Sequence, residues 1–394
     1  MAKQTIRDLH DLKGARIFVR VDYNVPVKEG KITDDTRIRA SLPTLEHLLK
    51  GGARLALASH LGRPKKGPTP EFSLKPVAAR LSELLGRPVA MAPDCVGEPV
   101  KEAAKAQGDA SVLLLENVRF HPEEEKNDPA FAKRLIDDTG ATVFVNDAFG
   151  SAHRAHASTE GVSHHVKTSV AGLLMEKEIK YLGMALEAPE RPFVAILGGA
   201  KVSDKIEVIE SLLPRVDTLL IGGGMAYTFF RAQGLAIGKS LVEEDKVELA
   251  KALLGRGKGK ILLPTDHVVA AEFKADAASK TLPVTEIPDG WMGLDVGPAT
   301  AKAFGDAVSK AKIVLWNGPM GVFEMKPFAE GTLAMAKALA ASKATTIVGG
   351  GDSVAAVTQM GLADKITHVS TGGGASLEFL AGDPLPGVAC LKEA

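Results

Sequence analysis

Short apolar runs alternate with segments of helical periodicity from one end of this chain to the other. The intervening segments carry apolar residues at helical spacing, for example over 39–50, 73–85, 204–213 and 328–342. Runs rich in Val, Ile and Leu recur between them, and each ends in polar residues or in glycine. Repeated strand–helix units of this kind predict parallel sheets covered by helices.

The strand ends divide the chain into two halves. In the first half they carry Asp, Asn, His and Arg, and in the second half they carry glycines. The segment 174–192 between the halves has a helical pattern followed by a proline-bounded loop. We therefore predict an α/β fold with domains over 1–173 and 193–376. Each should be a mainly parallel, doubly wound (Rossmann-like) sheet with helices on both faces, and 174–192 should be the hinge helix that joins them.

Composition excludes several classes of function. Lys+Arg and Asp+Glu both number 48 in the 394 residues, so a global basic field for nucleic acid is absent. No apolar run approaches the roughly 18 residues of a membrane span, and the first residues lack a signal-peptide core. Cys95 and Cys390 are far apart and form no metal or redox motif. We expect a cytoplasmic protein that binds neither nucleic acid nor membrane.

Four strand-to-helix junctions of the second half are glycine turns, at 197–201, 221–226, 348–353 and 370–376. One such turn is usually only a turn, because glycine closes turns at little cost. Four of them let the backbone approach a polyanion at several points, next to the free N–H groups of helix N-termini. Neither GxGxxG nor GxxxxGK[ST] occurs, so the dinucleotide fingerprint and the P-loop are both absent.

Lysines can supply the positive charge that a P-loop would have provided. Lys201 and Lys205 are four residues apart in "GGAKVSDK", and we expect them on one face at the start of a helix. The helix dipole disfavours cations there, which suggests a bound anion between them. Asp352 in "GGGDS" has the chemistry to hold Mg²⁺, although it could equally be a helix N-cap. Glu324, the last residue of "WNGPMGVFE", could accept hydrogen bonds from ribose hydroxyls.

The first half places cationic side chains near almost every strand end. They occur in "RVDYNVP", "SHLGRP", "ENVRF" and "NDAFGSAHRAHAS", and before a helix in "DDTRIRASLPT". Each is unremarkable alone, since surface arginines are usually only solvated. Together at one sheet edge they would bind phosphate and carboxylate groups, with Asp22 and Asn24 holding a hydroxyl. The candidate residues are Asp22, Asn24, Arg37, His60, Arg63, Arg119, His153, Arg154 and His156.

The quoted motifs resemble those of the phosphoglycerate kinase family over essentially the full chain. The strongest matches are "RIFVRVDYNVP", "SHLGRP", "NDAFGSAHRAHAS", "LGGAKVSDK", "WNGPMGVFE" and "GGGDS", in the family's order. The resemblance implies reversible phosphoryl transfer between 1,3-bisphosphoglycerate and MgADP, giving 3-phosphoglycerate and MgATP. A carboxylate acceptor is already ionised near neutral pH, so the reaction needs no general base.

The resemblance also assigns residues to the two substrates. It implies a phosphoglycerate site of Asp22, Asn24, Arg37, His60, Arg63, Arg119 and Arg154. It implies a nucleotide site of Lys201, Lys205, Gly293, Asn317, Glu324, Gly350, Gly351, Asp352 and Ser353, with Asp352 holding Mg²⁺. The expected catalytic residues are Arg37, Lys201, Gly351 and Gly374.

Further expectations concern the whole molecule. By resemblance, the segment 377–394 should pack back on the first domain, and the protein should be a monomer that closes about hinges at 174–192 and 370–376. Two other functions remain open from the residues alone. These are another ATP-dependent carboxylate kinase and a non-enzymatic two-domain anion-binding protein.

Overall fold

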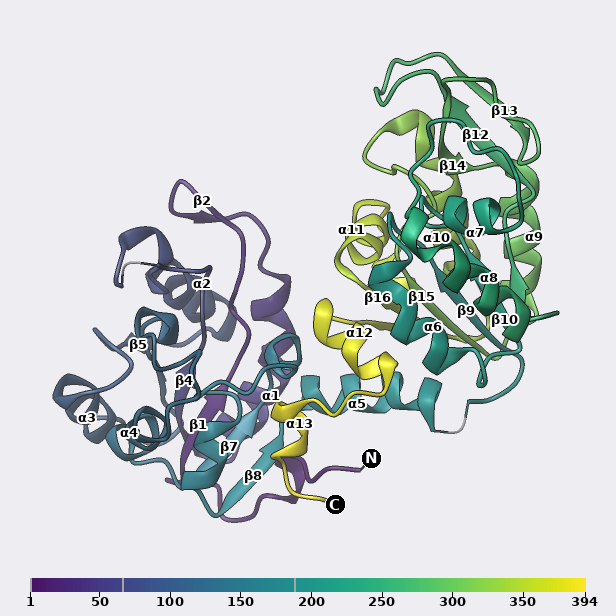
Figure 1. The fold of residues 1–394 in the computed structure, drawn as a ribbon. Coiled ribbons are helices and arrows are strands. Elements are labelled where there is room, and N and C mark those ends of the chain that lie inside the picture. The colour runs from purple at the N-terminus through teal and green to yellow at the C-terminus, as the bar shows by residue number, and fades with distance from the viewer. Residues whose placement is uncertain (1, 66, 188) are drawn as a thin grey trace. The chain divides into compact units, whose positions relative to one another are not determined.

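The structure is a computed structural model that describes residues 2–65, 67–187 and 189–394. The chain forms two compact units (Figure 1). Unit 1 contains the residues up to Lys180 together with Pro384–Ala394, and unit 2 is Tyr181–Asp383. No helix of the described ranges is long and apolar enough to cross a membrane.

Unit 1 is built on a six-stranded parallel sheet. Its strands lie in the order β5 (Val89–Met91), β6 (Val112–Leu114), β4 (Arg54–Ala58), β1 (Arg16–Arg20), β7 (Val143–Asn146) and β8 (Thr168–Ala171). The helices are α1 (Thr36–Lys50), α2 (Lys75–Leu85), α3 (Glu98–Lys105), α4 (Pro129–Thr139) and the short α13 (Pro386–Ala389). A two-stranded hairpin, β2 (Val27–Lys28) and β3 (Lys31–Ile32), precedes α1.

Both faces of this sheet are buried, as its nearly uninterrupted apolar strands require. Ile17 and Val19 of β1 belong to a core cluster with Leu45 of α1. Phe18 points to the other face, where its ring lies 6.2 Å from that of Phe144 and α4 contacts β1. The carboxyl ends of the strands are therefore the accessible edge, at which a ligand can meet several loops.

The last residues of the chain pack into unit 1. Gln4 donates its backbone N–H to the Lys392 carbonyl over 2.9 Å, and Lys392 N–H reaches the Ser169 carbonyl of β8 over 3.0 Å. Asn146 at the end of β7 donates from Nδ2 to the Gly387 carbonyl over 2.8 Å. Residues 377–381 belong instead to α12 (Gly374–Ala381), which lies in unit 2.

Unit 2 repeats the architecture with a second six-stranded parallel sheet. Its order is β11 (Ile261–Leu262), β10 (Thr218–Ile221), β9 (Phe193–Leu197), β15 (Ile313–Asn317), β16 (Thr345–Gly349) and β17 (His368–Val369). An antiparallel sheet, β13 (Ser279–Pro283), β12 (Asp266–Ala270) and β14 (Met292–Val296), is added to it in this unit.

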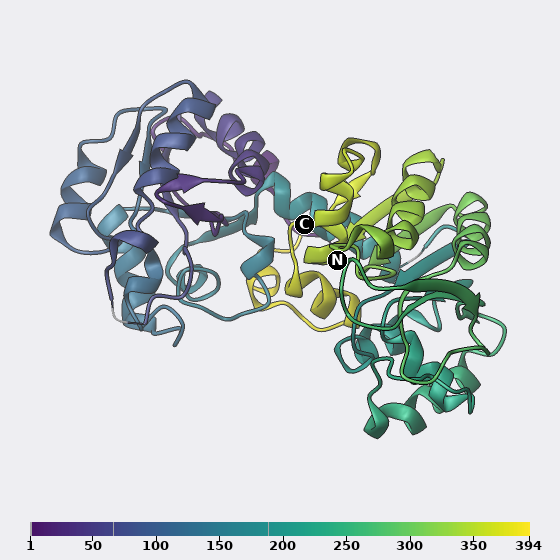
Figure 2. The same ribbon diagram turned by 90° about the horizontal axis from the view of Figure 1, so that it is seen from above.

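Helices cover both faces of the unit 2 sheet. The sequence order of the strands reverses at β9, so right-handed crossovers place the connecting helices on opposite faces. Figure 2 shows teal helices on one side and yellow-green helices on the other. The first group is α6 (Ile206–Leu212), α7 (Ala226–Ala232) and α8 (Val247–Arg256), and α12 contacts α6. The second is α9 (Pro298–Ser309), α10 (Glu330–Ala341) and α11 (Gly351–Gln359). The predicted fold class is confirmed.

Helix α5 (Leu173–Leu186) contains the point at which the chain passes from unit 1 to unit 2, between Lys180 and Tyr181. This point falls within the predicted hinge 174–192, of which residue 188 lies outside the described residues. Asp147, just after β7, caps the start of α5. Its Oδ1 accepts the backbone N–H groups of Leu174 and Met175 over 2.9 and 3.1 Å.

The Asp147 cap is fully buried, and burial raises the pKa of its carboxyl group to about 7. Its second oxygen, Oδ2, has no hydrogen-bond partner. Between pH 4 and pH 7 the folded state therefore keeps a proton that the unfolded state has released. The free energy of unfolding falls over this window as the pH rises.

We expect Asp147→Asn to remove this pH dependence. The amide keeps an acceptor for the α5 N–H groups and carries no ionisable proton. Relative to the variant, the wild type should lose about 1–4 kcal/mol of unfolding free energy between pH 4 and pH 7. Urea unfolding of both proteins at several pH values measures the difference. A difference that stays constant over this range would contradict the prediction.

Candidate functional sites at the carboxyl ends of both sheets

Arg37, Asp22 and Asn24 form one hydrogen-bonded group at the carboxyl end of β1. Arg37, in the first turn of α1, donates from Nη1 to both carboxylate oxygens of Asp22 over 3.1 Å and to the Asn24 carbonyl over 3.2 Å. The Asp22 carboxylate thereby offsets a cation that the helix dipole alone would disfavour. Asn24 accepts the Gly62 N–H at its Oδ1 over 2.8 Å, which ties the end of β1 to the end of β4.

His60, after β4, lies among several positive charges. Arg20 Nη2 is 3.1 Å from its Nδ1, and the side chain is almost fully buried. Burial is the main cause that holds the pKa of His60 well below its usual value, and the charges of Arg20, Arg119 and Arg37 lower it further. The imidazole is therefore neutral at pH 7. Three arginines from three different segments of the chain place their positive charges near this one side chain.

The remaining predicted cations lie around the same edge. Arg119 donates from Nη1 to the Gly62 carbonyl over 3.0 Å, and the charge of exposed Arg63 is among the causes that lower the pKa of Arg119, after burial. Arg154 donates from Nε to His153 Nε2 over 3.1 Å. Burial, then Arg119, Arg20 and Arg154, lower the pKa of His156 to about 4. The structure thus brings the predicted residues of unit 1 to one cationic site.

Arg20 is the residue of this site that the sequence prediction did not single out. It is the last residue of β1 and is 1% exposed. Its Nε donates to Ser158 Oγ over 2.7 Å, and that hydroxyl group donates to Glu124 over 2.5 Å. An arginine at the end of an otherwise apolar run was the available signal, because a buried guanidinium needs partners of this kind.

In unit 2, two adjoining cavities lie at the carboxyl end of the sheet. One, of about 490 Å³, is lined by apolar and aromatic side chains such as Tyr227 and Phe230. The other, of about 620 Å³, is lined by the glycine turns and by both lysines. Gly199, Ala200, Pro319 and Asp352 line both. The first contains the predicted residues Gly293 and Glu324, and the second contains Lys201, Lys205, Asn317, Gly350, Gly351, Ser353 and Gly374.

The expected placement of Lys201 and Lys205 on one helix face is wrong. Lys201 lies in the loop after β9, a 3₁₀ turn covers Ser203–Lys205, and α6 begins only at Ile206. The turn is held by Glu243, which accepts from Ser203 N over 2.9 Å and from its hydroxyl group over 2.5 Å. The helix therefore starts later than the spacing suggested.

The two lysines consequently differ in environment. Lys201 is exposed at the rim of the larger cavity. Lys205 is 9% exposed and donates to Asn317 Oδ1. Burial lowers the pKa of Lys205 to about 8, against the opposing effects of Asp204 and Asp352. Lys205 is therefore a fixed and mostly charged group at neutral pH, whereas Lys201 is free to move toward a ligand.

The glycines of these turns fall into two groups, and a different physical reason explains the absence of a side chain in each. At Gly223 the φ angle is +69°, and a Cβ would lie 2.6 Å from the backbone of Gly199. Gly318 has φ +97°, and a Cβ there would lie 2.2 Å from the Gly198 carbonyl. Gly351 and Gly374 have nothing within 4 Å of a Cβ, so packing within the protein does not require glycine at these two positions. There the space beside the backbone belongs to the cavity.

The alternative that Asp352 is a helix N-cap is wrong. Gly350 is the N-cap of α11, and Asp352 lies one residue inside the helix with its side chain exposed toward both cavities. Neighbouring Ser353 is buried, and its Oγ accepts the Gly318 N–H over 2.6 Å. Ser353 therefore holds the turn after β15, while the Asp352 carboxylate remains available for a ligand.

Taken together, the fold and the two sites define a two-domain α/β phosphotransferase. One unit presents a cationic site, and the other presents an apolar cavity joined to a glycine- and lysine-lined one. Residues 6–383 match the sequence profile of the family described as phosphoglycerate kinase. The chain belongs to the phosphoglycerate kinase family.

Relatives and solved structures agree with this assignment. The chain is 64% identical to "Phosphoglycerate kinase, cytosolic" of Triticum aestivum, covering 98% of this chain and 97% of that protein. It is 62% identical to "Phosphoglycerate kinase" of Moorella thermoacetica, with both chains covered completely. The solved structure of phosphoglycerate kinase from Coxiella burnetii is similar with a TM-score of 0.90, 42% identity and 98% of each chain covered.

The predicted activity is thereby confirmed. The protein is a transferase of glycolysis that moves a phosphoryl group between 1,3-bisphosphoglycerate and ADP, giving 3-phosphoglycerate and ATP. It is an ATP:3-phospho-D-glycerate 1-phosphotransferase, and its substrates are small molecules.

Proposed function

We propose that unit 1 binds the phosphoglycerate and unit 2 binds the nucleotide. The observation that supports phosphoglycerate binding by unit 1 is the cationic site around His60, where several arginines meet. Among the described residues, the only short contact of Arg37 with a carboxylate is the one with Asp22. Guanidinium groups bind phosphate and carboxylate oxygens in pairs. Asp22 and Asn24, at the same place, have the acceptors needed for a substrate hydroxyl group.

The adjoining cavities of unit 2 support the second half of the proposal. The apolar cavity suits a nucleobase, and Glu324 lines it where ribose hydroxyls need an acceptor. The larger cavity suits the phosphate chain, with lysines and unhindered glycine backbone at Gly351 and Gly374. An exposed carboxylate shared by both cavities fits Mg²⁺, which prefers oxygen ligands and substrate phosphates. Asp352 would hold the ion, which neutralises charge on the phosphates when bound.

Arg37 and Lys201 are the proposed stabilisers of the transferring phosphoryl group. Phosphoryl transfer depends on alignment and charge neutralisation rather than on proton abstraction, and the accepting carboxylate is already ionised. Both side chains are partly exposed beside their sites. Lys205, fixed by Asn317, would instead position the phosphate chain in the ground state.

We propose further that the protein is a cytoplasmic monomer. Relatives from wheat and Arabidopsis thaliana carry the word "cytosolic" in their names. Large hydrophobic side chains exposed among the described residues are few and comprise Leu241, Leu262 and Phe273. Isolated exposed apolar residues of this number are normal for a monomer.

We expect Arg37→Ala and Lys201→Ala each to lower kcat by about 10²–10³-fold, the cost of losing one charge-stabilising donor. The measurement is a coupled assay of Mg²⁺-dependent phosphorylation of 3-phosphoglycerate by ATP. Arg39→Ala is the matched control for Arg37, because Arg39 lies in the same helix and pairs with Asp35. Lys310→Ala, at the end of α9, is the control for Lys201. Variants that lose less than threefold in kcat would contradict these roles, and an inactive wild type would contradict the proposed function itself.

Direct transfer requires the two bound substrates to meet, so we propose that the units approach each other during the reaction. Closure also excludes water that would hydrolyse the acyl phosphate. The proposed hinges are α5 with the residues that follow it, and the glycine turn 370–376. Small-angle scattering should show a smaller radius of gyration with both substrates than with either one. An unchanged radius would contradict this proposal.

A further inference from the structure

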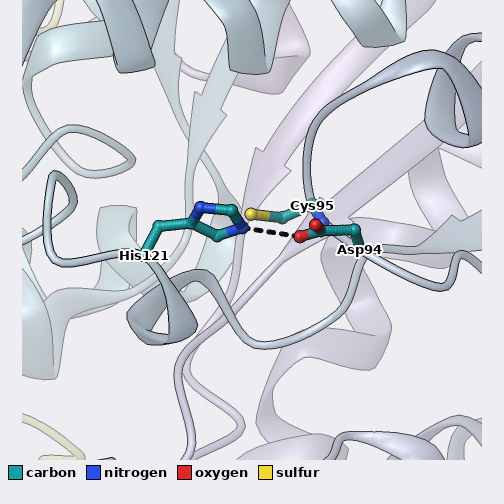
Figure 3. A group of neighbouring side chains, drawn as sticks. All are labelled: Asp94, Cys95 and His121. Carbon is teal, nitrogen blue, oxygen red and sulfur yellow. Dashed lines mark hydrogen bonds and ion pairs between the residues drawn. The ribbon is translucent and has the colours of Figure 1, made fainter. Parts of the chain in front are cut away.

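A group of three potential metal ligands lies in unit 1, outside the residues assigned to the substrates. Asp94 and Cys95 follow β5, and His121 follows the 3₁₀ turn Val118–Phe120 after β6. Strands β5 and β6 are neighbours in the sheet, which brings these two loops together. Figure 3 shows the three side chains pointing toward one another. The 26-residue separation between Cys95 and His121 hid this group from the search for sequence motifs.

The geometry of the group is close to that of a metal site. One ligand atom from each side chain (a carboxylate oxygen, the thiol sulfur and a ring nitrogen) lies within 4.8 Å of the other two. Bonds of 2.0–2.3 Å in a tetrahedral zinc site place ligand atoms about 3.3–3.8 Å apart. His121 Nε2 and Asp94 Oδ1 are hydrogen-bonded at 2.7 Å, and the same oxygen accepts the Cys95 backbone N–H over 2.6 Å. An ion would replace the proton between Nε2 and the carboxylate, after a small outward movement of the partly exposed Asp94 side chain.

The ligand types select a particular class of cation. Thiolate and imidazole ligands favour Zn²⁺ and similar ions over Mg²⁺, which takes oxygen ligands. We propose that Asp94, Cys95 and His121 bind one borderline-soft divalent cation of the zinc type, with solvent as the fourth ligand. Side-chain exposures of 45% for Asp94 and 27% for His121 give solvent and the ion a route to this position.

The alternative is that His121 and Asp94 form only a hydrogen-bonded pair beside an inert buried cysteine. Burial, and then the Asp94 charge, raise the pKa of the Cys95 thiol well above its usual value. Metal ions bind cysteine as the thiolate, so a bound ion would displace the thiol proton, whereas an inert cysteine would release none.

A cation here would connect two loops at the edge of the cationic site. His121 is two residues from Arg119, and the same turn begins at Asn117, whose Nδ2 donates to the Leu61 carbonyl over 2.8 Å. Binding would therefore join the loop after β5 to the turn that carries Arg119. The expected effect is stabilisation of unit 1 that grows with the concentration of the free ion.

Cobalt(II) is the probe of choice, because a cobalt–thiolate bond gives a charge-transfer absorption that nitrogen and oxygen ligands do not. The full-length protein is treated with a chelator, freed of nucleotide and titrated with Co²⁺ at pH 7.5. We expect a thiolate band that saturates at one equivalent and disappears when Zn²⁺ is added. Cys95→Ser should abolish the band. Cys390→Ser, which removes the chain's other cysteine, should leave it unchanged.

His121→Gln is the second variant, since the partial exposure of His121 makes unfolding less of a concern than at buried Cys95. We expect it to weaken Co²⁺ binding at least about tenfold. Circular dichroism verifies that each variant is folded. The proposal is overturned if the wild type shows no thiolate band, if the band is lost in Cys390→Ser, or if His121→Gln binds Co²⁺ as tightly as the wild type.

Discussion

The concentration of positive charge at the carboxyl end of the unit 1 sheet is the constraint on which the proposed chemistry of this protein depends. Like charges brought together in a protein repel one another, and this repulsion adds to the effect of burial in lowering the pKa of His60. Only part of the charge is balanced internally, by Asp22 against Arg37 and by Glu124 near Arg20. Arg119 also has Glu125 at 3.5 Å, but Glu125 is exposed, so a ligand that carries both a phosphate and a carboxylate group would complete the charge balance of the proposed site.

Buried polar contacts make this charge concentration compatible with a stable fold. Arg20 is almost fully buried, and its hydrogen bonds reach Ser158, the Val21 carbonyl and His60. A neutral His60 can accept from Arg20, whereas a protonated imidazole would oppose it. The neutral imidazole is thus both a consequence of the field and a part of the scaffold that holds Arg20.

The proposed nucleotide site of unit 2 would bind a polyanion by a different physical route. Its glycine turns supply backbone N–H groups, and its charge is concentrated in two lysines of unlike environment rather than in many arginines. Gly223 and Gly318 let the turns pack closely, whereas Gly351 and Gly374 leave room beside the backbone.

Strand-end composition alone distinguished these two halves, which is why the fold class, and the gathering of the candidate residues at one edge of each sheet, could be predicted from the sequence. The start of α6 could not be predicted, because Glu243, forty positions after Ser203 in the chain, determines it. The role of Arg20 and the meeting of Cys95 with His121 likewise depend on the pairing of strands, which no local pattern records.

The most direct test of this account is a pH titration of the His60 imidazole by nuclear magnetic resonance, with and without 3-phosphoglycerate. Without ligand, His60 should stay neutral well below the usual pKa of a histidine. Because the ligand's negative charges would offset those of the arginines, its binding should raise the pKa of His60, and binding should take up protons at low pH. A His60 pKa that does not change while 3-phosphoglycerate is bound would contradict the claim that the cationic site holds this substrate.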